Sequence, residues 1–81
     1  MQRFEFGDFR FEAEADPADA RRLRVLVFKA GEALLDLHGQ HYTKGFAPGV
    51  SAERLEAFCR RFATDDAFRT QMLLKHAFAC C

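Results

Sequence analysis

The sequence contains no tryptophan, only two prolines, and no excess of charge of either sign. Its twelve basic and twelve acidic residues cancel, so the chain lacks the long-range field that draws proteins to nucleic acid or anionic lipid. The apolar run Val25 to Phe28 is only four residues long, and no apolar stretch follows Met1. We therefore expect no membrane span, no signal peptide and no nucleic-acid partner.

The three cysteines do not form the framework of a disulfide-stapled secreted domain, because their number is odd and Cys80 and Cys81 are adjacent. A reducing compartment fits this usage best, so we expect a cytoplasmic protein. The length of 81 residues predicts a single small domain over residues 1–81, which buries only about 60% of its unfolded surface. Its stability then depends on efficient apolar packing or on a partner subunit, and a homodimer is one expectation.

The first twelve residues have the pattern of a β-hairpin around Gly7 and Asp8. A two-residue loop at this point places four phenylalanines on one face and opposite charges on the other. The phenylalanine face and the charge pairs independently fit the same strand register, so the hairpin is the structural prediction with the most support. The predicted pairs are Phe6 with Phe9, Phe4 with Phe11, Glu5 with Arg10, and Arg3 with Glu12.

Residues 17 to 38 carry signals of a long helix. Asp16 can cap it, Pro17 suits its first position, and Gly39 is a natural stop. Apolar residues recur between them at steps of three and four. A third strand at residues 23–28 is the competing interpretation, because β-branched residues are frequent there. We favour the helix for its strong start signal and leave the strand open.

Two further helices are expected toward the C-terminus. Ser51 can cap a helix that runs to Ala63, and a hydroxyl followed by two aspartates starts another over residues 65–79. Residues 39–50 hold three of the five glycines and are expected to form the main loop. The predicted fold is therefore α+β, with the N-terminal β-hairpin packed on a three-helix unit.

The main loop is the best place for recognition, because an aromatic pair on a glycine-flexed loop can supply the anchors found at interface centres. No nucleophile can be combined with a base and an orienting carboxylate, so we expect neither enzymatic activity nor a cofactor. The predicted partner-binding residues are His41, Tyr42, Lys44 and Phe46.

The C-terminal tail is the sharpest chemical cluster, with His76, Cys80 and Cys81. Residues four apart on a helix share a face, and imidazole with thiolate is a pair that binds zinc or copper. A metal- or thiol-dependent function of this tail is an alternative to protein binding.

The segment from Ser51 to Met72, with Leu55-Glu56-x-Phe58 and Asp65-Asp66-x-Phe68, resembles the helical leader segments of ribosomal peptides related to small nitrogen-fixation-cluster proteins. Enzymes of that group modify residues placed after the leader. The resemblance implies a second alternative, in which the chain is a peptide substrate modified at its C-terminal cysteines.

The leading hypothesis is a small non-enzymatic module that binds another protein by surface contact. Such a chain acts as an adaptor, as an inhibitor such as a phage-type anti-defence protein, or as an antitoxin-like factor.

Overall fold

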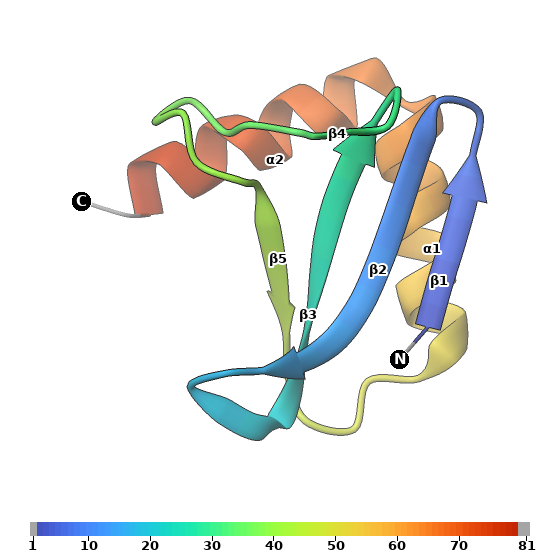
Figure 1. Cartoon of the computed structure of the whole chain (residues 1–81), viewed down its shortest axis with the longest axis vertical. Coiled ribbons are helices and arrows are strands. Elements are labelled where there is room, and N and C mark those ends of the chain that lie inside the picture. The colour runs from blue at the N-terminus through green and yellow to red at the C-terminus, as the bar shows by residue number, and fades with distance from the viewer. Residues whose placement is uncertain (1, 80–81) are drawn as a thin grey trace.

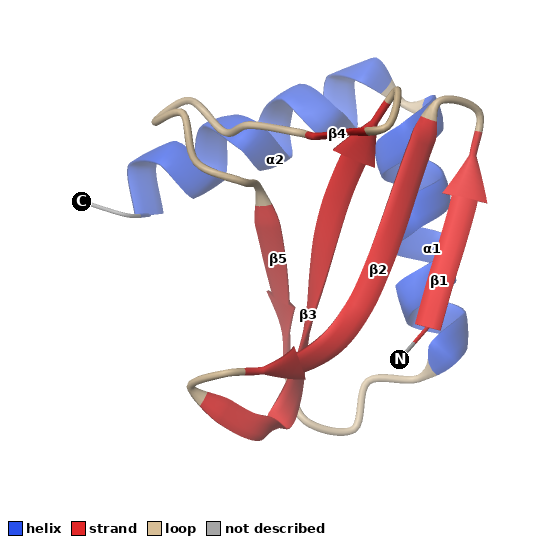
Figure 2. Ribbon diagram, in the orientation of Figure 1, coloured by secondary structure: helices blue, strands red, loops and turns tan. Residues whose placement is uncertain are grey.

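The computed structural model describes residues 2–79, with side chains described through residue 76. This part of the chain forms a five-stranded antiparallel sheet with two helices on one of its faces (Figure 1). The strand order is β1-β2-β3-β4, and β5 also pairs with β3 (Figure 2). The elements are β1 (Gln2–Phe6), β2 (Phe9–Asp16), β3 (Asp19–Lys29), β4 (Glu32–Ala33), β5 (Thr43–Phe46), α1 (Ala52–Thr64) and α2 (Asp66–Ala79).

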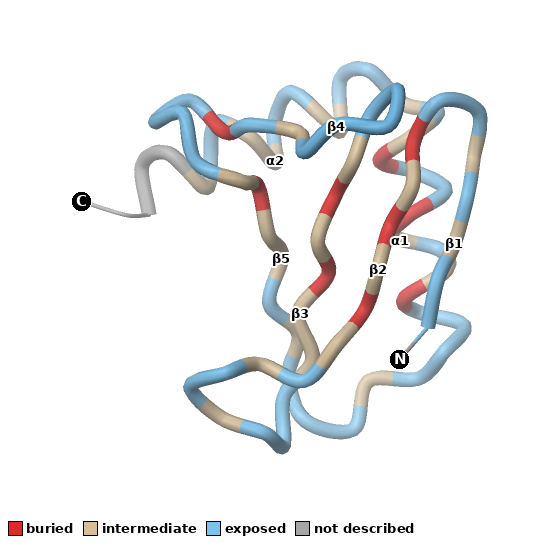
Figure 3. The backbone as a smooth tube through the Cα atoms, viewed as in Figure 1, coloured by how far each residue is buried: buried red, intermediate tan, exposed pale blue. Residues whose placement is uncertain are grey.

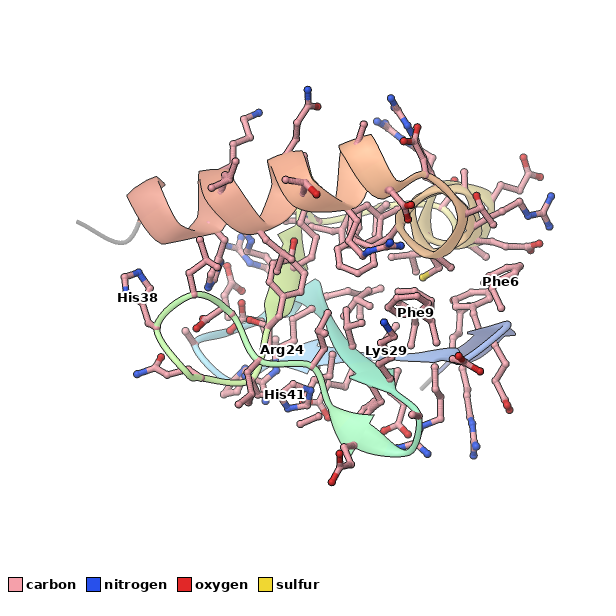
Figure 4. The ribbon with its side chains drawn as sticks, turned by 90° about the horizontal axis from the view of Figure 1, so that it is seen from above. Phe6, Phe9, Arg24, Lys29, His38 and His41 are labelled. Atoms are coloured by element: carbon pink, nitrogen blue, oxygen red, sulfur yellow. The ribbon has the colours of Figure 1, made fainter. Side chains whose placement is uncertain are left out.

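The predicted hairpin is confirmed in its predicted register, since all four expected residue pairs are observed between β1 and β2. Gly7 takes a φ of 61° in the two-residue loop, a conformation that glycine adopts at no steric cost. Phe9 and Phe11 are buried, while Phe4 and Phe6 pack against the edge of the core. Figure 4 shows Phe6 and Phe9 pointing from the sheet toward the helices.

The predicted helix over residues 17–38 is wrong, and with it the three-helix unit. The competing strand at 23–28 is the correct interpretation and lies within the longer strand β3. The start signal belongs to a turn: the Asp16 carboxylate accepts from the Ala18 N–H at 2.8 Å. Aspartate and proline suit a tight turn as well as a helix N-terminus.

Further residues of the predicted helix also belong to the sheet. Val25 and Val27 are fully buried and pair with residues of β2, as expected for every second residue of a half-covered strand. Gly31, with a φ of 83°, lies in the turn between β3 and β4. The expected main loop, residues 39–50, is irregular except at its centre, where β5 forms.

The two C-terminal helices are confirmed. Ser51 caps α1, and its hydroxyl accepts from the Arg54 N–H at 3.2 Å. Asp65, rather than the Thr64 hydroxyl expected from the sequence, caps α2, and its carboxylate accepts from the Phe68 N–H at 3.0 Å. Thr64 is the last residue of α1, and its hydroxyl donates to the Arg60 carbonyl oxygen at 2.7 Å. Neither described helix is long and apolar enough to cross a membrane.

The core lies between α1 and the strands β2 and β3 (Figure 3). Phe62 is at its centre and is fully buried. Its ring centroid lies 6.0 Å from Phe9, 5.9 Å from Phe11, 5.4 Å from Tyr42 and 5.7 Å from Phe58. One helical side chain therefore contacts β2, the residue before β5 and its own helix.

Cys59 is a buried core residue rather than a reactive thiol. Burial, with a contribution from the charge of Glu56, raises the pKa of Cys59 to about 12, and the thiolate is the reactive form. In a variant with Cys80→Ser and Cys81→Ser, iodoacetamide at pH 8 should leave the folded protein unmodified and alkylate it fully in denaturant. Mass spectrometry measures the extent of Cys59 alkylation in both conditions. Equal rates of alkylation with and without denaturant would contradict the burial of Cys59.

Candidate partner-binding groove

The predicted partner-binding residues lie on or next to β5, whose alternation sends them to two faces of the sheet. Lys44 pairs with the buried Val25 and so shares the helix-covered face. His41 lies on the uncovered face (Figure 4), where its Nε2 donates to the Val27 carbonyl oxygen at 2.8 Å and its ring lies 4.8 Å from that of Phe28. The four residues therefore do not form one surface.

Tyr42 belongs to the core. It is 1% exposed, its ring stacks on Phe62, and it meets His76 edge-on with the centroids 5.2 Å apart. Burial raises the pKa of Tyr42 to about 12. Its aromatic ring stabilises the junction of sheet and helices and leaves little surface for a partner.

Lys44 and Phe46 line a cavity of about 640 Å³. It is bounded by β5, the segment 47–51, α1 and the beginning of α2. Six of the lining side chains define what we call the basic groove. They are the cations Lys44, Arg54 and Arg61 and the rings of Phe46, Phe58 and Phe68.

The rings of the basic groove form its floor. Phe58 meets Phe46 edge-on at 5.4 Å between centroids and Phe68 edge-on at 5.9 Å. Two of the cations lie over these rings, with Arg61 4.2 Å from the centroid of Phe68 and Lys44 5.6 Å from that of Phe46. Such contacts hold cationic side chains in place while their polar ends stay hydrated.

No carboxylate of the described residues lines the groove. The nearest partner is Asp65, whose Oδ2 lies 3.7 Å from the Nε of Arg61 in a half-exposed pair. Exposed pairs of this kind contribute little. Among residues 2–79, neither Lys44 nor Arg54 has an ion-pair partner for its side chain. A chain with no net charge thus concentrates positive charge at one concave site.

Sequence reasoning identified Lys44 and Phe46 but missed the helical half of the groove. Arg54, Phe58 and Arg61 follow one another at steps of four and three, which places them on one face of a helix. This spacing is the sequence signal for the helical half of the groove. It indicates a binding site only when β5 is known to lie opposite this face of the helix.

The predicted metal-binding tail is only partly described. His76 Nε2 lies 3.0 Å from Oδ2 of Asp36, and this contact ties α2 to the loop between β4 and β5. Cys80 and Cys81 lie outside the described residues. Within residues 2–79, no group of three or more side chains could hold a metal ion. The metal and thiol alternatives stay predictions.

Asp36 anchors the loop that leads into β5. The Gln40 N–H, 3.0 Å from its carboxylate, holds the pKa of Asp36 below its usual value, with further contributions from the His38 N–H at 2.8 Å and from His76. The pKa of Asp36 is thus lower in the folded protein than its value of about 3.9 in the unfolded chain, so the ionised carboxylate stabilises the fold above about pH 3.9. This stabilisation is lost as the pH falls through the folded-state pKa.

The melting temperature of the wild-type protein should therefore fall more steeply below about pH 4 than that of an Asp36→Asn variant. Asp8→Asn, in the exposed hairpin loop, is the control and should follow the wild-type curve. Thermal unfolding followed by circular dichroism between pH 2 and pH 7 measures the difference. Parallel curves for wild type and Asp36→Asn would contradict this role of Asp36.

Comparison of the chain with protein-family models, curated proteins and solved structures finds no match in any of the three. The resemblance of residues 51–72 to peptide leaders is therefore supported by the sequence pattern alone, and the modified-peptide alternative stays a prediction.

Proposed function

We propose that this protein is a small non-enzymatic binding module that captures an acidic segment of another protein in the basic groove. The observation that carries the proposal is the set of three cations around an aromatic floor with no carboxylate in the described lining. Ion pairs of such exposed cations with carboxylates contribute up to about 1 kcal/mol each, and a groove with three cations forms several at once. The parts of the rings that Arg61 and Lys44 leave uncovered supply an apolar contact for a neighbouring side chain of the partner.

The size and shape of the groove suit a peptide. A cavity of about 640 Å³ is in the range of sites that enclose a few side chains. Capture of this kind is how adaptors, inhibitors and antitoxin-like factors act, since each occupies a surface of its partner. A cytoplasmic partner protein fits the cysteine usage.

A nucleic acid is the less favoured occupant. Bases stack on free aromatic faces, but Arg61 covers a face of Phe68 and Lys44 lies over Phe46. The zero net charge also gives no general attraction to a phosphate backbone. A single-stranded oligonucleotide is therefore included in the test as a competitor.

Selection from a displayed library of random peptides tests this proposal. The immobilised protein should enrich peptides that combine aspartate or glutamate with an apolar residue. Arg54→Glu should abolish this enrichment, and it should leave the fold intact because glutamate three residues after the Ser51 cap suits a helix N-terminus.

The matched control is Arg22→Glu, which makes the same charge change at an exposed position on β3. It should retain the enrichment. Equal recovery of acidic peptides by Arg54→Glu, enrichment without carboxylates, or displacement of the selected peptides by an oligonucleotide would each contradict the proposal.

A further inference from the structure

We infer that the acidic segment binds in an extended conformation, as an added strand along the free edge of β5. The inference rests on the proposed function, because edge and groove form one site. Within residues 2–79, β5 pairs with β3 alone, and Figure 2 shows β5 at one side of the sheet. Strand addition to an exposed sheet edge is a common mode of peptide recognition.

The backbone of β5 offers hydrogen-bonding groups to a new strand. The Tyr42 carbonyl oxygen accepts from the Val27 N–H at 3.4 Å, and Lys44 lies opposite Val25. Because successive residues of an antiparallel strand alternate in direction, the N–H and C=O groups of Thr43 and Gly45 point away from β3. These unpaired groups are what an added strand would satisfy.

The side-chain environment along this edge matches an acidic occupant. Lys44 and Gly45 line both the basic groove and a second cavity of about 360 Å³, so the two cavities together flank β5. The second cavity adds Lys75, and no carboxylate lines it within the described residues. His76 also lines it, but its Nε2 is already held 3.0 Å from Oδ2 of Asp36. Alternate side chains of an added strand would fall on this helix-covered side, where their carboxylates meet Lys44 and Lys75.

A second copy of the chain is a poor occupant of this edge in the register that pairs the outward groups of Thr43 with those of Gly45. Antiparallel pairing of two β5 strands with Thr43 opposite Gly45 would place Lys44 opposite Lys44 of the other copy, and like charges directly opposite are destabilising. The edge strand β1 carries one positive and one negative side chain, Arg3 and Glu5, and so shows no preference for an acidic strand. The homodimer expected from the sequence stays a prediction that this edge does not favour.

The first test uses a capped peptide, acetyl-Glu-Thr-Glu-Thr-Leu-Thr-Glu-Thr-amide, which alternates acidic or apolar residues with threonine. Two derivatives carry N-methyl groups, one on the threonine nitrogens and the other on the remaining nitrogens. Since an added strand points only alternate N–H groups at its neighbour, one derivative should bind at least about tenfold more weakly while the other stays within about twofold of the parent. Fluorescence anisotropy measures all three.

The second test changes the protein. Gly45→Pro removes the outward N–H, and proline is tolerated on an edge strand. Gly45→Ala is its matched control, because a Cβ at this position meets no atom within 4 Å and the N–H is kept. The proline variant should lose about tenfold in affinity for the capped peptide, the alanine variant should not, and both should retain the wild-type melting temperature.

The outcomes separate the two proposals. Tight binding of the parent peptide with equal affinities of the two derivatives, or of the two Gly45 variants, would overturn strand addition and leave capture in the groove standing. A parent peptide that fails to bind, or that a single-stranded oligonucleotide displaces, would overturn both.

Discussion

Replacing Phe62 by alanine should lower the free energy of unfolding by about 3–5 kcal/mol, the range for a fully buried phenylalanine. Its ring contacts four other rings from β2, from the residue before β5 and from α1. Domains have about 0.05–0.15 kcal/mol of stability per residue, so a chain of 81 residues would lose a large share of its total. Urea unfolding monitored by circular dichroism measures this loss.

Phe4→Ala is the control for this prediction. Phe4 is half-buried on β1 and packs at the border of the core, so its truncation leaves a smaller cavity and should cost less than about half as much. Equal losses in the two variants would show that the helix–sheet core is not centred on Phe62.

The double variant Arg54→Glu with Arg61→Glu should bind the capped peptide at least about tenfold more weakly. Each arginine removed deprives a carboxylate of an ion pair of up to about 1 kcal/mol, and each glutamate introduced adds repulsion. Arg61 also loses its contact with the Phe68 ring, but such exposed contacts contribute only about 0.5–1 kcal/mol. Arg61 also loses its ion pair with Asp65, so the melting temperature should fall by several degrees, at about 4–8 °C per kcal/mol for a chain of this size, without loss of the fold.

Arg21→Glu with Arg22→Glu is the matched control, because it changes the net charge equally at exposed positions of β3. Its affinity for the capped peptide should stay within about twofold of wild type at physiological salt, because neither arginine lines the basic groove or the second cavity. Equal losses in the two double variants would assign the effect to overall charge rather than to the basic groove.

The hairpin could be predicted because its information is local. A single loop, Gly7-Asp8, fixes the register, and the side chains on both faces agree with it. The segment from residue 17 to 38 could not be predicted in the same way. Leu23, Val25 and Val27 fit a period of two, while Leu23, Leu26 and Val27 fit a helical face, and the long-range pairing of β3 with β2 and β5 decides between them.

The site was only half predictable for a related reason. Lys44 and Phe46 were recognised as contact residues within one segment, but the floor that they complete comes from α1 and α2 through Phe58 and Phe68. Strand alternation separates His41 from this site and buries Tyr42. That alternation becomes visible only once β5 is known to be a strand.

The most direct test of capture in the basic groove is a titration of the isotope-labelled protein with the capped peptide, followed through its backbone amide chemical shifts. The account predicts that the largest changes occur at Thr43, Gly45, Arg54 and Arg61. It would be contradicted by changes concentrated at Arg10 and Glu12 of β2, on the uncovered face of the sheet, or by a spectrum that the peptide leaves unchanged.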